Sequence, residues 1–327
     1  LQVSPSEEDL EGANSAYATK LSIIENCLYG VDIQPIAVQI AKLRCFISLI
    51  IEEHPNADKP NLGIPTLPNL ETKFVCADTL MPLSINTSRK SMSLFDYYTR
   101  ELNALKNELL SVRHDHFKAS TYQDKTALRN KDKEIRAKLT KLFENNKTTA
   151  SDDIALVTAW DPYDQNASSN FFVPLLMFTV TGCLDGVIGN PPYIQLQTNG
   201  GLLGERYRPC GYQVFAKTGD MYCLFYERSH QLIKPNGSVC LITSNKWMRA
   251  GYGESLRGFL ATETDPRLLV DFAGEKVFES ATVDVNILLF KKAQNSGQTL
   301  ACSMTKDGRN NMSLFVQQNG TLTDYSP

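Results

Sequence analysis

The stretch Gly186-Val187-Ile188-Gly189-Asn190-Pro191-Pro192-Tyr193 decides how the rest of the chain is interpreted. Its apolar start predicts a buried strand, which ends at the first proline because proline lacks a backbone donor and restricts the residue before it. Asn190 is therefore expected at a strand tip. Its amide oxygen and the carbonyl of Pro191 can both accept hydrogen bonds from one planar amine, which the ring of Tyr193 can cover. The stretch predicts a site for an exocyclic amine, unless it is only a strand terminator with a turn tyrosine.

A short strand over residues 28–33 contains Asp32 near its carboxyl end. Pro35 suits the first turn of the helix that follows, and the helix is predicted from apolar residues repeating at helical spacing: Ile36, Ile40, Leu43, Ile47 and Ile50. In open α/β sheets ligands bind at the carboxyl edge of the strands, and an acid there commonly holds ribose hydroxyls. Asp32 could equally cap the helix.

Another short strand, over residues 73–78, ends at Asp78. The carboxyl ends of parallel strands meet at one edge of a sheet, so two strands that each end in Asp indicate a ligand site more strongly than either alone. A structural cap is the alternative for Asp78 as well.

In this order the three segments resemble the γ-type adenine-N6 DNA methyltransferases, over roughly residues 20–292. The resemblance implies an α/β fold: the Rossmann-like sheet of S-adenosylmethionine-dependent methyltransferases, mostly parallel with a final antiparallel strand. It implies that Asp32 binds the cofactor's ribose, that Ile33 packs on its adenine, and that Asp78 bonds the adenine amine. Thr79 and Leu80 would line the same pocket.

The resemblance also implies the target side of the site. Its catalytic residues would be Asn190, Pro191, Pro192 and Tyr193, acting on an adenine flipped out of double-stranded DNA. Phe278 matches the aromatic residue that packs on the flipped base. Asp220 can cap the helix that follows the loop after Tyr193, and Asp220 and Tyr222 are further candidates for the pocket.

Residues 94–148 are long, charged and helix-forming, with 12 Lys/Arg against 8 Asp/Glu. Two stripes of apolar residues, separated by a break at 119–121, predict a helical hairpin: Leu102, Leu105, Leu109 and Val112, then Leu128, Ile135, Leu139 and Leu142. The hairpin is either a solvated structure or a basic prop that touches the DNA backbone or a neighbouring domain. Such an insertion resembles the large type II (type IIG-like) restriction–modification methylases and the BREX-type phage-defence methylases.

These features predict four regions. Residues 1–93 form the cofactor-side half of the methyltransferase domain, 94–150 the helical insertion and 151–293 the catalytic half. Residues 294–327, with a strand-like piece near 314–316, are expected to begin a target-recognition region or to be a linker. The aromatic segment 160–178 is expected to be loop-like and to have mainly a packing role.

The glycine-rich loop that cradles the cofactor's methionine end in this family has no counterpart upstream of Asp32. The chain is therefore expected to be part of a longer polypeptide, which supplies the first strand, the cofactor loop, a possible nuclease and a downstream target-recognition domain. On this expectation the fragment alone is inactive and binds S-adenosylmethionine weakly or not at all.

Composition excludes several other classes. The chain of 327 residues has 42% hydrophobic residues and a net charge of −3, which indicates a globular protein. Its eight cysteines include no C-x-x-C pair, and no stretch has the roughly 20 apolar residues of a membrane span. His114 and His116 are two apart on a predicted helix and face different directions. We expect a cytoplasmic protein without a metal site or membrane contact.

Two other functions stay open on the sequence. A protein-glutamine or RNA-guanine N-methyltransferase would use the same four residues that begin at Asn190. A DNA-recognition fragment of the same fold, without catalysis, is the alternative outside the enzymes.

Overall fold

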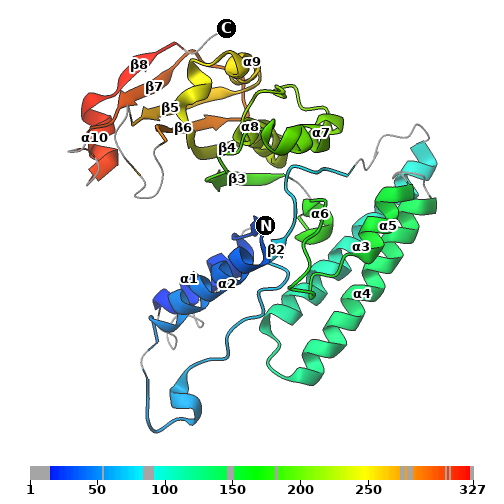
Figure 1. The fold of residues 1–327 in the computed structure, drawn as a ribbon. Helices are drawn as coiled ribbons and strands as arrows, with labels where there is room; N and C mark the ends of the chain where they lie inside the picture. Colours follow the sequence, from blue (N-terminus) through cyan, green and yellow to red (C-terminus); the bar gives the residue numbers. More distant parts are fainter. Residues whose placement is uncertain are drawn as a thin grey trace. The chain divides into compact units, whose positions relative to one another are not determined.

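The computed structural model divides the chain into two compact units, Leu1–Thr181 and Gly182–Pro327, each of which is described here by itself. Figure 1 labels the helices and strands of both units. The structure describes the following residues: 15–53, 55–83, 92–145, 151–180, 183–272, 277, 283–305, 308 and 311–324.

The first unit begins with two helix–strand segments. Helix α1 (Ser15–Asn26) leads to strand β1 (Gly30–Asp32), helix α2 (Pro35–Ile50) follows, and strand β2 (Phe74–Cys76) comes after a loop with the short 3₁₀ turn Pro60–Gly63. Strands β1 and β2 pair in parallel, and Asp32 lies opposite Cys76. Pro35 occupies the first turn of α2, as the sequence predicts, where its missing N–H costs no hydrogen bond.

Helix α2 buries a different face from the one its repeating isoleucines suggest. Val38 and Leu49 pack into the core cluster with Leu70 and Phe74. The repeating residues are about half exposed or more: Ile36 (64%), Ile40 (48%), Leu43 (55%) and Ile47 (51%). Helical spacing predicted the helix correctly, but within the described residues this stripe has no covering surface.

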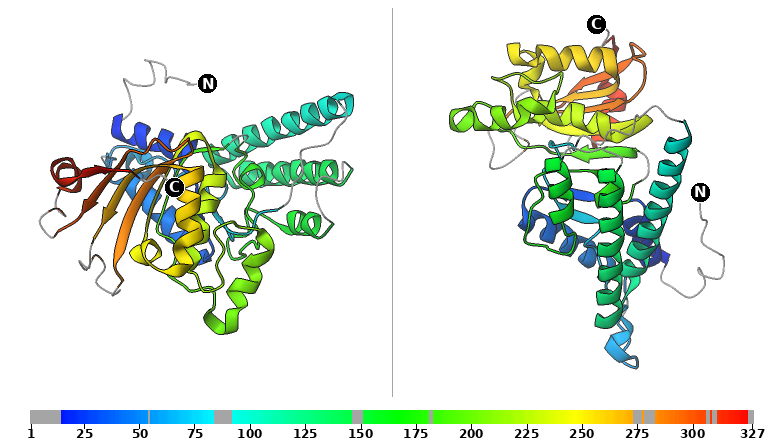
Figure 2. Two further views of the ribbon diagram at one scale, coloured as in Figure 1. Left: turned by 90° about the horizontal axis from the view of Figure 1, so that it is seen from above. Right: turned by 90° about the vertical axis from the view of Figure 1, so that its right-hand side faces the viewer.

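The predicted helical hairpin is confirmed. Helix α3 (Met92–Lys118) and helix α4 (Tyr122–Asn145) run antiparallel and side by side, and helix α5 (Ser151–Ala159) packs beside α4 (Figure 2). Most of the predicted stripe residues are buried: Leu102, Leu105, Leu109, Val112, Ile135, Leu139 and Leu142. The segment 160–178 contains the single-turn helix α6 (Pro174–Met177), and Phe171, Phe172 and Phe178 are buried as packing residues.

The second unit is built on a six-stranded mixed sheet. Its strands are β3 (Leu184–Gly189), β4 (Ile233–Ser244), β5 (Asp265–Asp271), β6 (Val285–Lys291), β7 (Thr299–Ser303) and β8 (Thr321–Thr323), in the order β3-β4-β6-β5-β7-β8. Strand β6 is antiparallel to both β4 and β5, whereas β3 pairs with β4 in parallel. The α/β class with its antiparallel strand in a hairpin is confirmed.

Helices connect these strands and cover the sheet. Helix α8 (Met221–Leu232) and helix α9 (Glu254–Glu263) contact each other and pack against β3, β4 and β5 (Figure 2). The remaining helical pieces are α7 (Leu202–Tyr207), α10 (Met312–Asn319) and the 3₁₀ turns Thr198–Gly201, Arg208–Cys210, Asn245–Met248 and Gly251–Gly253.

Two predictions about this unit are wrong. Residues 314–316 lie in helix α10, which Asn311 caps by accepting a hydrogen bond from the backbone N–H of Leu314. Strand β3 was predicted to be buried, but Ile188 is 86% exposed, because among the described residues no layer covers the face of the sheet from which its side chain projects. An apolar run predicts the strand but not whether both faces of the strand are covered.

The described residues contain no helix long and apolar enough to cross a membrane. They also contain no group of three or more His, Cys, Asp or Glu side chains placed to hold a metal ion.

Candidate active site at the tip of strand β3

Asn190 directly follows Gly189, the last residue of strand β3, so it lies at the strand tip as the sequence predicts. Strand β3 is parallel to β4, and this tip is at the carboxyl end of both strands. Asn190 is exposed and Pro191 is buried, which anchors the turn while the amide of Asn190 stays accessible. The edge where Asn190 lies is the one at which α/β sheets bind ligands.

Tyr193 reaches back to Asn190. Its hydroxyl donates a hydrogen bond to Oδ1 of Asn190 at 2.9 Å. Burial raises the pKa of Tyr193, so the phenol keeps its proton at neutral pH and remains a donor. An amide oxygen has two lone pairs, so Oδ1 can accept a second hydrogen bond from a ligand while Tyr193 holds the amide in place.

Two further tyrosines and an acid support Tyr193. The rings of Tyr193 and Tyr222 meet edge to face, with centroids 6.2 Å apart and planes at 85°. The hydroxyls of Tyr222 and Tyr252 are 2.8 Å apart, and Tyr252 donates to Oδ2 of Asp220 at 2.8 Å. Burial raises the pKa of both Tyr222 and Tyr252, so this chain of hydroxyls stays neutral. The ring of Tyr193 therefore packs against the ring of Tyr222, whose hydroxyl is held in place by hydrogen bonds.

Asp220 was predicted to cap helix α8, and this is wrong in detail. Asp220 is the N-cap residue, but its side chain makes no capping hydrogen bond and instead accepts from Tyr252. Tyr252 was missed in the sequence because it lies 32 positions from Asp220 and no local pattern links them. Tyr222 lies beside Tyr193, and Asp220 is linked to Tyr222 through the hydroxyl of Tyr252. That Asp220 and Tyr222 are pocket residues stays a prediction.

The loop after Tyr193 is fastened to the start of α8. The backbone N–H of Leu196 donates to the carbonyl of Gly219 at 2.9 Å, and that of Met221 donates to the carbonyl of Ile194 at 2.8 Å. These bonds close the long loop between Leu196 and Gly219 at its base, so the loop does not loosen the site.

In the first unit, Asp32 and Asp78 lie at the carboxyl ends of the paired strands β1 and β2. The carbonyl of Asp32 accepts a hydrogen bond from the N–H of Ala77 at 2.9 Å, which joins the two strand ends. Oδ1 of Asp32 accepts from the N–H of Gln34 at 2.8 Å, and the side chain is exposed. Asp78 is 3% exposed, and its Oδ1 accepts from the N–H of Leu80 at 3.1 Å. Both carboxylates thus stabilise the turn that follows their strand.

The other predicted cofactor residues differ in exposure. Ile33 is 49% exposed and offers an apolar surface, Thr79 is half-buried, and Leu80 is 1% exposed within the core. Phe278, predicted to contact the target base, lies outside the described residues.

Comparison with known proteins identifies similarity to methylases of restriction-modification systems. The family model described as Eco57I restriction-modification methylase matches residues 26–278. The type II methyltransferase M.PaeR7I of Pseudomonas aeruginosa is 28% identical over 124 residues, which cover 38% of this chain and 21% of that protein. The type II restriction enzyme and methyltransferase RM.Eco57I of Escherichia coli is 30% identical over 111 residues, or 33% of this chain and 11% of that protein. The match therefore spans about a fifth of these relatives or less.

One solved structure covers nearly the whole chain. It is the type IIL restriction-modification enzyme MmeI in complex with DNA. The matched region covers 97% of this chain and 37% of the MmeI chain, with 11% sequence identity and a TM-score of 0.39.

Proposed function

Because the chain belongs to the Eco57I restriction-modification methylase family, we propose that it carries out methyl transfer from S-adenosylmethionine to N6 of adenine in double-stranded DNA. The observation that supports the proposal most strongly is the position of Asn190. Its amide oxygen lies at the carboxyl tip of β3, 2.9 Å from the hydroxyl of Tyr193, with a lone pair to spare for an amine.

The amide oxygen of Asn190 and the carbonyl of Pro191 would activate the amine, because each would accept a hydrogen bond from one of its two N–H groups. The lone pair of an adenine amine is spread into the ring, which makes the amine a poor nucleophile. Two accepting oxygens favour a pyramidal nitrogen, on which the lone pair is localised. The amine then becomes a better nucleophile without prior removal of a proton. Catalysis by these residues is positioning plus electrostatic stabilisation.

Tyr193 would hold the base itself. An adenine must leave the duplex to reach such a pocket, at a cost of a few kcal/mol on the order expected for base flipping, and stacking on an aromatic ring offsets part of it. The Tyr222–Tyr252–Asp220 contacts keep the Tyr193 ring in one orientation for this purpose. Phe278 is proposed as the second stacking residue.

The residues of the first unit fit an adenosine group. Among the described residues, Oδ2 of Asp32 has no hydrogen-bond donor, so this exposed carboxylate can accept from ribose hydroxyls. Ile33 would pack on the adenine, and Asp78 with Thr79 and Leu80 would form the rest of that pocket. The bound cofactor would supply the methyl group.

The test is methyl transfer by the intact protein and by Asn190→Ala. The variant should lose at least about 100-fold in turnover, the scale for removing one preorganised hydrogen-bonding group from a transition state, while DNA binding changes little. Asn130→Ala, at an exposed position of α4, is the matched control and should keep normal activity. Tritiated methyl incorporation measures the rate, and digestion of the DNA identifies the methylated base.

The same assay separates the alternatives. Duplex DNA, RNA and protein are offered as acceptors in parallel, and N6-methyladenine in the DNA is the expected product. Near-normal turnover by Asn190→Ala, or methyl transfer only to RNA or protein, would contradict the proposal.

A further inference from the structure

A cavity of about 600 Å³ lies at the opposite end of strands β1 and β2 from Asp32 and Asp78. Tyr29 directly precedes β1, and Lys73 directly precedes β2, so both line the cavity at the amino ends of the strands. The end of α1 and one face of α3 form other walls. Its volume is within the roughly 300–1,000 Å³ range of small-molecule sites in proteins.

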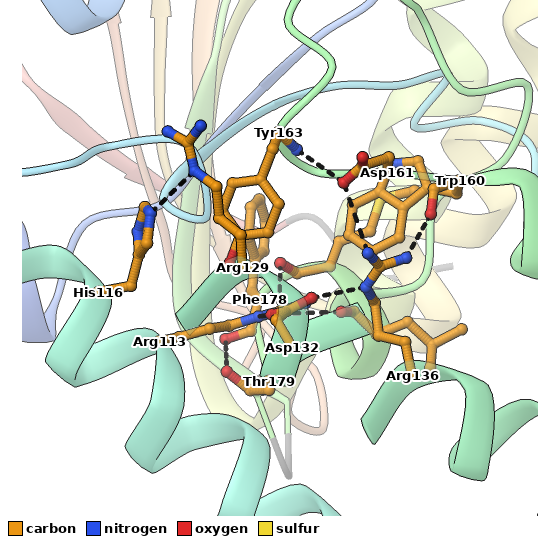
Figure 3. A network of polar contacts seen from close by, with 12 residues as sticks. Arg113, His116, Arg129, Asp132, Arg136, Trp160, Asp161, Tyr163, Phe178 and Thr179 are labelled. Carbon is orange, nitrogen blue, oxygen red and sulfur yellow. Dashed lines mark hydrogen bonds and ion pairs between the residues drawn. The ribbon is translucent and has the colours of Figure 1, made fainter. Parts of the chain in front are cut away.

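Arg113 of α3 brings a buried positive charge to this cavity. Its side chain is 4% exposed and is fixed on two sides: Nε donates to Asp132 at 2.7 Å, and Nη1 donates to the carbonyls of Leu176 and Met177 at 3.0 Å each (Figure 3). Nη2 has no hydrogen-bond partner among the described residues. A buried guanidinium N–H without an acceptor costs free energy, and an anion in the cavity can supply that acceptor.

Lys73 is a second cation on the cavity wall. Its Nζ lies 4.5 Å from the centre of the Tyr29 ring, and within the described part of the chain no carboxylate pairs with it. Burial lowers the pKa of Lys73 to about 8, which Glu25 opposes and Arg113 reinforces. Two cations that repel each other in one cavity form a site that an anion stabilises.

Glu25 is the acid on the wall, and its nearer partner, His114, lines the same cavity. Oε1 of Glu25 lies 2.8 Å from Nδ1 of His114 and 3.3 Å from Nζ of Lys118. Two cations, Lys73 and Arg113, therefore line the cavity with one carboxylate, Glu25, which His114 and Lys118 contact.

The remaining walls suit a ring and hydroxyl groups. The rings of Tyr29 and Phe178 are 4.9 Å apart and tilted by 36°. Phe178 and Phe117 also line the cavity but are 4% and 1% exposed, so the half-buried Tyr29 is the more accessible ring. Thr72 and Ser111 line the cavity with hydroxyls. Aromatic faces accept a planar heterocycle, and hydroxyls hydrogen-bond to a sugar.

We propose that this cavity binds a nucleoside monophosphate, with its phosphate on Lys73 and Arg113 and its base against the half-buried ring of Tyr29. A nucleotide combines the three features that the walls call for: a charged oxyanion, a hydroxylated sugar and a flat ring. The site is separate from the proposed cofactor residues, because the full length of β1 and β2 lies between them.

The experiment is calorimetry on the intact protein with guanosine 5′-monophosphate, chosen because an adenosine probe could also bind at Asp32 and Asp78. We expect saturable binding at one site, with binding of guanosine or of inorganic phosphate alone at least tenfold weaker. Lys73→Met should weaken nucleotide binding at least tenfold. Lys131→Met, at a surface lysine of α4 outside the cavity, and Asp32→Ala should bind as the wild type does.

A second variant covers the case in which Lys73→Met misfolds, which its thermal unfolding curve would reveal. Ser111→Trp fills the cavity from an exposed position of α3 and should abolish binding without touching either cation. The proposal is overturned if the wild type shows no binding at millimolar nucleotide. It is also overturned if folded Lys73→Met or Ser111→Trp binds like the wild type, or if phosphate alone binds as tightly as the nucleotide.

Discussion

The helical hairpin and helix α2 belong to the same unit, but each buries residues of the kind that its sequence would place in solvent, or exposes residues of the kind that its sequence would bury. The hairpin is rich in charge and encloses Arg113, Asp132 and Arg136, which are 4%, 0% and 8% exposed. Helix α2 is mainly apolar and leaves Ile36 and Ile40 about half exposed or more. Residue type alone would have assigned the opposite environments.

The difference shows that partners decide burial. Asp132 is enclosed because both of its oxygens are paired: Oδ2 with Nε of Arg113 at 2.7 Å and Oδ1 with Nε of Arg136 at 2.6 Å (Figure 3). A buried charge is tolerated when paired and hydrogen-bonded in this way. The isoleucines of α2 have no surface among the described residues to cover them. The hairpin is therefore more than a solvated insertion, because its charges form part of the core of its unit.

The largest effect is expected at Asp132. Asp132→Ala leaves two buried guanidinium groups without their carboxylate and should lower the free energy of unfolding by about 3–5 kcal/mol. Asp115→Ala, at an exposed position of α3, is the matched control and should change it by less than about 0.5 kcal/mol. Denaturant unfolding followed by circular dichroism gives both values. Equal small losses would mean that the buried network contributes no more than a surface charge.

The same carboxylate predicts a pH dependence. Burial raises the pKa of Asp132, but Arg113 and Arg136 outweigh it and hold the pKa below the ordinary value of 3.8. A carboxyl group with a lowered pKa in the folded state stabilises the protein above its unfolded pKa and loses this contribution as pH falls through the folded value. The stability difference between wild type and Asp132→Asn should therefore be constant above about pH 5 and shrink at pH values below 3.8.

Features that depend on short stretches of sequence could be predicted. The strand tip at Asn190 and the first turn at Pro35 follow from proline's missing donor and fixed backbone angle. The two hairpin helices follow from helical spacing over many turns.

Features that depend on distant residues could not be predicted. Asp132 meets Arg113 across 19 residues, and Arg113 meets Leu176 across 63, so no local pattern marks these two contacts. Within the network, the Asp132–Arg136 pair has helical spacing, four residues apart on α4. The hydrogen bond from Tyr252 to Asp220 could not be predicted for the same reason, since 32 positions separate the two residues. The exposure of Ile188 on β3 depends on whether another layer covers its face of the sheet, which an apolar run does not encode.

The next prediction concerns the buried face of α2. Leu49 is fully buried in the cluster with Val38, Leu70 and Phe74. Leu49→Ala should lower the free energy of unfolding by about 2–5 kcal/mol, because it removes apolar burial and leaves a cavity. Thermal unfolding and amide hydrogen exchange in α2 measure the loss. A loss below about 1 kcal/mol would mean that the core beneath α2 collapses around the substitution.

The smallest effect is expected on the other face of the same helix. Ile40 is 48% exposed, so Ile40→Ala removes a side chain of the same size as Leu49 from a position that stays half in water. The lost burial is partly offset by the better helix propensity of alanine, and the net loss should be below about 1 kcal/mol. The contrast between the two substitutions, measured in the same protein by the same unfolding experiment, tests the burial of α2 directly. If Ile40→Ala costs as much as Leu49→Ala, a surface that the described residues do not provide covers the stripe in solution, and the comparison between α2 and the hairpin no longer holds.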